Sequence, residues 1–127
     1  MDLKSYFENT KGIGVLSTAD SEGNVDSALY ARPHVMDDGN VALIMRDRLS
    51  HANLQSNPKA AYLFLEEGSG YKGKRFFLTK VSEEQDSEKI ESLRRRSYAP
   101  DDRMHQGKVF LVYFQIDREL PLIGSGK

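Results

Sequence analysis

The sequence predicts a mainly β domain, an antiparallel barrel capped by helices. Six short segments are alternating or wholly apolar, which is the pattern of strands. Most of them follow one another at hairpin spacing, with glycine, asparagine and aspartate in the connections. Segments of helical pattern interrupt the strands, and this combination is typical of a barrel with helical caps.

In chain order, helices are expected at 2–10, 48–56 and 83–96, and strands at 12–18, 25–36, 41–45, 59–65, 75–81 and 108–117. The first helix is predicted because Leu3, Tyr6 and Phe7 recur at helical spacing on one face. In the second strand the side chains alternate, and Pro33 has no N–H to donate, so that end of the strand is placed at an edge or a bulge. The third strand, Val41–Met45, is apolar throughout, which indicates that both of its faces are covered.

The middle of the chain is predicted to form a helix followed by a hairpin. Asp47 is the expected N-cap of this second helix, because its carboxylate can accept orphan backbone N–H groups. Pro58 ends the helix. Two strands with a polar, glycine-rich loop over 66–74 then form the hairpin. We interpret the loop as a flexible connection, since its glycines match no phosphate-binding motif.

The C-terminal part is predicted from local helix signals. Ser82 and Gln85 form a capping box that would start the third helix, and Arg94–Arg96 would complement the dipole at its end. Residues 98–107 are expected to be a loop. The apolar tail Leu120–Gly124 is too short for a core element, so we expect it to pack on a neighbour or to cover a barrel end.

Composition narrows the functional classes. The chain has no cysteine, which excludes disulfides, thiolate nucleophiles and cysteine-ligated metals. A net charge of −1 gives no overall field that would favour nucleic acid or an acidic membrane. No apolar run approaches the ~20 residues of a membrane helix, and the N-terminus lacks the pattern of a secretory signal. We therefore expect one cytoplasmic domain over residues 1–127, with no metal, nucleic-acid or membrane partner.

Basic residues gather near the predicted start of the second helix. Arg32 lies on the second strand, and Arg46 and Arg48 precede the helix. A guanidinium grips phosphate through paired hydrogen bonds, and a helix N-terminus adds free N–H groups. The pattern indicates a phosphate site in which Ser50 is a further donor. The alternative is three surface arginines, one of them paired with Asp47.

Four local sequences carry a family resemblance that covers nearly the whole chain. They are Gly14–Thr18 as first strand, Asp38-Gly39 before a buried strand, Asn53–Pro58 closing a helix, and Gly70–Arg75 leading into the fifth strand. Together with the order of the elements, they resemble the pyridoxamine 5'-phosphate oxidase-like family, the FMN-binding split barrels, and its small bacterial members in particular. The resemblance implies a six-stranded antiparallel split barrel.

Members of this family are typically homodimers that hold FMN in two clefts at the subunit interface. The resemblance thus implies an FMN-binding homodimer and a flavin-dependent oxidoreductase acting on a small molecule, in which the flavin carries the redox chemistry. No side chain stands out as a catalytic proton donor. The implied cofactor contacts come from the second strand, the end of the third strand and the following helix: Ala28, Leu29, Tyr30, Ala31, Arg32, Ile44, Met45, Arg46, Asp47, Arg48, Leu49, Ser50 and Asn53.

Two basic positions of the family are altered in this chain. The lysine that meets the FMN phosphate falls on Ser50, and a second basic position falls on Pro33. Neighbouring arginines are the expected replacements. True pyridoxamine 5'-phosphate oxidase activity is not expected. Two alternatives stay open: a non-catalytic module that stores or senses a flavin or haem, and a cofactor-free dimer with a structural or stress-associated role.

Histidines are further candidates for a role at the site. His34 shares a strand face with Tyr30, so it can line the same cleft and donate to a flavin or a substrate. His51 is expected to point elsewhere. His105 lies in a predicted loop, where the resemblance makes haem ligation conceivable, but nothing at metal-ligand spacing supports it. The alternative for each is an ordinary surface position.

Overall fold

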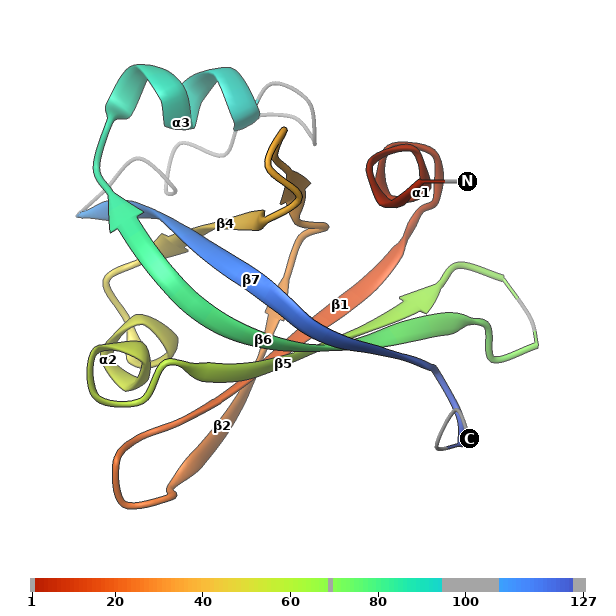
Figure 1. Cartoon of the computed structure of the whole chain (residues 1–127), viewed down its shortest axis with the longest axis horizontal. Coiled ribbons are helices and arrows are strands. Elements are labelled where there is room, and N and C mark those ends of the chain that lie inside the picture. Colours follow the sequence, from red (N-terminus) through yellow and green to blue (C-terminus); the bar gives the residue numbers. More distant parts are fainter. Residues whose placement is uncertain (1, 69, 95–107, 125–127) are drawn as a thin grey trace.

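The computed structural model describes residues 2–68, 70–94 and 108–124. These residues form a curled antiparallel sheet with three helices around it (Figure 1). The elements are α1 Leu3–Asn9, β1 Gly12–Ala19, β2 Val25–Tyr30, β3 His34–Val35, β4 Val41–Arg46, α2 Leu49–Ser56, β5 Lys59–Glu66, β6 Gly73–Glu84, α3 Ser87–Arg94 and β7 Val109–Pro121. The predicted mainly β barrel with helical caps is confirmed.

The strands follow the order β2-β1-β5-β6-β7-β4-β3 across the sheet, and neighbouring strands are antiparallel. The long strands β6 and β7 cross the middle of the molecule (Figure 1). The two edge strands, β2 and β3, are consecutive in the chain and are joined by residues 31–33. The curled sheet is therefore open along one seam, between β2 and β3.

This seam replaces the single strand that was predicted over 25–36, so the described sheet has seven strands and not six. Pro33 accounts for the break, because it cannot donate to a ladder. The hydroxyl of Tyr62 donates to the carbonyls of Tyr30 and Ala31, at 3.3 and 3.1 Å. These bonds satisfy backbone groups at the point where β2 ends.

Aromatic side chains fill the inside of the barrel. Phe7, from α1, packs edge-on against Phe64 with ring centroids 5.4 Å apart, and Tyr62 and Phe76 lie on its other sides. Strand β4 is buried on both faces, as its apolar sequence predicted, because Ala42 lies outside the barrel in a separate cluster with residues of α3 and β7. Helix α1 thus plugs the barrel, and α3 covers the back of β4 and β7.

The predicted capping box at Ser82 and Gln85 is wrong. Strand β6 continues to Glu84, because residues 82–84 pair with β7, and the third helix begins only at Ser87. There the carboxylate of Asp86 accepts a hydrogen bond from the Lys89 N–H at 3.2 Å.

The end of β7 also differs from the prediction. Leu120 and Pro121 continue β7 and pair with the start of β6, so this part of the apolar tail belongs to the sheet. The predicted loop over 98–107, with His105, lies outside the described residues, and so do Arg95 and Arg96.

Candidate ligand-binding cavity

A cavity of about 390 Å³ opens beside the seam, between β2, β4 and the first turn of α2. Its size is within the usual range for small-molecule and cofactor sites. It brings together most of the residues that the sequence placed at the cofactor. The lining consists of Asp26, Ala28, Leu29, Tyr30, Ala31, Arg32, His34, Leu43, Ile44, Arg46, Arg48, Leu49 and Ser50.

Three of the predicted site residues do not line the cavity. Met45 is fully buried in the barrel core. Asn53 is buried on the inner side of α2, where its amide donates to the hydroxyl of Thr18 at 3.0 Å and ties the helix to β1. Asp47 is exposed and lies 3.8 Å from Nδ1 of His51. These residues support the wall of the cavity from behind or from outside it.

The alternation of β2 shapes one wall. Asp26, Ala28 and Tyr30 share one face of β2 and are partly buried, while Val25 and Leu29 on the other face are 82% and 75% exposed; Leu29 also borders the cavity. The small side chain of Ala28 leaves room between the two larger neighbours on its face.

Two arginines stand at the corner between β4 and α2. The N–H of Arg48 donates to the carbonyl of Arg46 at 2.8 Å, which makes the turn tight. Arg48 is the N-cap residue, and its side chain makes no capping hydrogen bond, so the predicted N-cap role of Asp47 is wrong. A helix start without a side-chain acceptor leaves its first N–H groups to water or to a ligand. Together with the two guanidinium groups, this corner can bind an anion.

Arg32 lines the cavity but also has a structural task. Its Nη1 donates to the carbonyls of Phe7 and Thr10, at 2.7 and 3.0 Å. These carbonyls are at the end of α1, where a cation complements the helix dipole. Arg32 thus holds α1 against the seam, and only its remaining N–H groups can donate to a ligand.

Ser50 links the helix start to β2. It is 4% exposed, and its hydroxyl lies 3.5 Å from Oδ2 of Asp26, which is long for a hydroxyl hydrogen bond. Burial raises the pKa of Tyr30, and the charge of Asp26 acts in the same direction, against the influence of the Ser50 hydroxyl and the charge of Arg48. Tyr30 is therefore a protonated hydrogen-bond donor at neutral pH.

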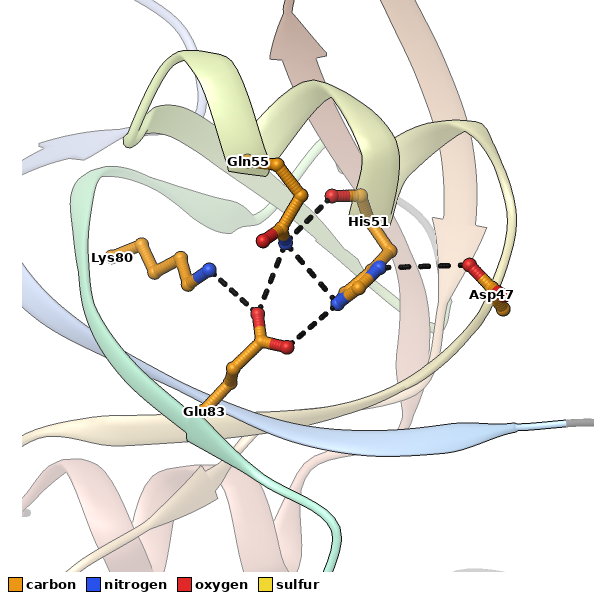
Figure 2. A network of polar contacts seen from close by, with 5 residues as sticks. All are labelled: Asp47, His51, Gln55, Lys80 and Glu83. Carbon is orange, nitrogen blue, oxygen red and sulfur yellow. Dashed lines mark hydrogen bonds and ion pairs between the residues drawn. The ribbon is translucent and has the colours of Figure 1, made fainter.

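The sequence predicted that His51 points away from the site, and His51 indeed does not line the cavity. It belongs to a polar network behind α2 (Figure 2). Its Nε2 lies 2.9 Å from Glu83 Oε2, and its ring stacks on Phe110 with centroids 3.8 Å apart. Lys80 and Gln55 contact the other oxygen of Glu83, at 2.6 and 3.0 Å. The network fastens α2 to β6.

The network also sets the acidity of Glu83. Burial would raise the pKa of this carboxyl, but hydrogen bonds from Lys80, His51 and Gln55 outweigh burial and lower the pKa to about 2. Glu83 therefore remains a carboxylate in the folded protein at all moderately acidic pH values. Charge-assisted hydrogen bonds of this kind are stronger than neutral ones.

Two lining residues, Asp26 and Leu43, were not among the predicted site residues. Asp26 lies on the same face of β2 as Ala28 and Tyr30, so the alternation along this strand was the available signal. His34, which the sequence made a candidate, lines the cavity and is 5% exposed.

Among the described residues, no group of three His, Cys, Asp or Glu side chains could hold a metal ion. No helix in the described part of the chain is long and apolar enough to cross a membrane.

Solved structures share this arrangement of strands and helices. An FMN-binding protein from Syntrophomonas wolfei subsp. wolfei aligns over 96% of this chain and 84% of its own, with a TM-score of 0.75 and 20% identity. The fold is a split barrel. Further split barrels are an F420 reductase (TM-score 0.73, 10% identity, 94% and 98% coverage) and a candidate pyridoxamine 5'-phosphate oxidase from Lactobacillus delbrueckii (TM-score 0.65, 15% identity, 91% and 88% coverage). No protein-family model and no curated protein matches this split barrel.

Proposed function

We propose that this protein binds FMN in the cavity beside the seam and acts as a flavin-dependent oxidoreductase on a small molecule. The observation that carries the proposal is the anion corner, where Arg46 and Arg48 stand at the uncapped start of α2 in a split barrel. These groups would hold the phosphate. Leu43, Ile44 and Ala28 offer an apolar surface for a flat ring, and Tyr30 and His34 offer polar contacts. Bound FMN would supply the hydride chemistry.

We propose further that the protein is a homodimer. Leu29 and Leu49 line the cavity and are 75% and 57% exposed, and Val25 and Ile13 extend this apolar surface along β2 and β1. A second copy on this surface would bury the exposed side chains and screen the cavity mouth from water. Such screening strengthens the interaction of fixed charges with a bound phosphate.

The test is a titration of the purified protein with FMN and with riboflavin, which lacks the phosphate. R46A and R48A are each expected to weaken FMN at least about tenfold and riboflavin much less, because a charge-assisted bond to the phosphate is lost. R118A, which removes an exposed arginine from β7, is the matched control. Equal loss for both compounds would mean that the two arginines do not hold the phosphate.

Two further measurements bear on the cofactor and on catalysis. FMN at 100 times its Kd should raise the free energy of unfolding by about 2.7 kcal/mol, and no thermal shift would refute FMN binding. Anaerobic addition of NADH or NADPH should bleach the bound flavin. Binding without reduction by either donor would favour a non-catalytic flavin module over an oxidoreductase.

A further inference from the structure

Asp26 gives the proposed phosphate site an unexpected charge. Among the described residues that line the cavity, it is the one acidic side chain. Its carboxylate lies 3.5 Å from the hydroxyl of Ser50, and Ser50 is in the first turn of α2. A phosphate held at the start of this helix would therefore lie close to a carboxylate as well as to two arginines.

The other polar groups around this point come from four elements. Tyr30 stands on β2 with Asp26, His34 comes from β3, and Arg46 comes from β4. Arg48 and Ser50 belong to the start of α2. Arg32 adds a further cation, although its Nη1 is held by two carbonyls of α1.

A carboxylate repels each added negative charge on a nearby phosphate. A doubly charged phosphomonoester has only acceptor oxygens, so it can form no hydrogen bond with Asp26. A singly charged phosphate interacts differently, because its protonated oxygen can donate to the carboxylate, and an esterified oxygen carries little charge. The long Ser50–Asp26 contact leaves the serine hydroxyl able to turn to the remaining oxygens.

We propose that Asp26 makes this cavity select a flavin phosphate that carries a single negative charge. The accepted forms are a phosphodiester-linked flavin and FMN with a protonated phosphate. This inference rests on the proposed flavin function and names the ligand class of the same site.

The experiment compares the wild type with D26N by titration with three probes: FMN, the cyclic phosphodiester of riboflavin, and riboflavin. At about pH 8, where the FMN phosphate carries two charges, D26N should bind FMN at least about tenfold more tightly than the wild type. The gain should be roughly threefold for the singly charged cyclic phosphodiester and absent for riboflavin, since repulsion scales with charge. E22Q, which removes an exposed acid from the β1–β2 turn, should change none of the three affinities.

The second arm varies pH with the wild type. The FMN phosphate takes up one proton near pH 6 and becomes singly charged, so the ratio of FMN to riboflavin affinity should rise at least about threefold from pH 8 to pH 5. Riboflavin corrects for titration of His34 and of other protein groups. The rise should be absent in D26N, and D26S provides a second variant if D26N does not fold. A ratio that falls on acidification in the wild type would overturn the inference.

The outcomes separate this inference from the proposed function. If D26N changes the affinity for all three probes equally, Asp26 does not discriminate between ligands by the charge of the phosphate, while flavin binding stands. If neither the wild type nor the variants bind any of the three probes, the flavin function is refuted and the inference with it.

Discussion

Replacing Glu83 by glutamine should destabilise the protein in a pH-dependent way. Folding lowers the pKa of Glu83 from an ordinary 4.5 to about 2. At about 1.4 kcal/mol per pKa unit, the full shift corresponds to about 3 kcal/mol. The carboxylate is still 22% exposed, and solvent screening reduces this to about 1–2 kcal/mol. E83Q keeps the shape of the side chain but loses the charge that Lys80 and His51 contact.

The sign of the pH dependence follows from the lowered pKa. A carboxylate whose folded pKa is depressed stabilises the protein fully above its unfolded value and loses this contribution as pH falls through the folded value. The free energy of unfolding, measured with urea, should therefore differ by about 1–2 kcal/mol between wild type and E83Q at pH 7. At pH 3 less than half of that difference should remain. E22Q, on an exposed turn, serves as the control. A difference that is the same at both pH values would refute this account of the network.

Two other substitutions test the seam and the outer face. A Cβ at Gly14 would lie 1.9 Å from the Tyr62 hydroxyl and 2.6 Å from the Tyr30 carbonyl. G14A should therefore cost more than about 2 kcal/mol in urea unfolding, and a cost below about 1 kcal/mol would show that β1 and β5 separate easily. L29E places a charge on an exposed leucine at the cavity mouth and should give a monomer by light scattering with weakened FMN binding. I123E, which charges an exposed apolar residue after β7, should leave the proposed dimer intact; loss of a dimer in I123E alone would place the interface elsewhere.

The fold and most of the cavity could be predicted because their signals are local or periodic. Alternation in β2 placed Tyr30 and Ala28 on one face, and the apolar run of β4 indicated a strand covered on both sides. Together with the family resemblance, these patterns put the arginines at the start of α2. The same alternation included Asp26, whose significance became visible only when the helix brought Ser50 beside it.

The wrong predictions concern competition between local and long-range interactions. The capping signal at Ser82 is genuine as a local pattern, but pairing of β6 with β7 offers those residues a complete ladder of hydrogen bonds. Asp47 suits an N-cap by residue type, yet it lies beside His51, and Glu83 holds that histidine from 32 residues away in the sequence. No pattern within a short window reports such a partner.

The break at Pro33 connects the fold with the proposed function. It ends β2, separates β2 from β3 and places Arg32 and His34 at the cavity. Because the sheet is open at the seam, the elements around it are held by other hydrogen bonds. These come from the Tyr62 hydroxyl, the Arg32 guanidinium and the Glu83 network. Each of these interactions holds an element that lines or borders the cavity. Loosening any of them should therefore lower the stability of the fold and weaken the proposed ligand binding at the cavity.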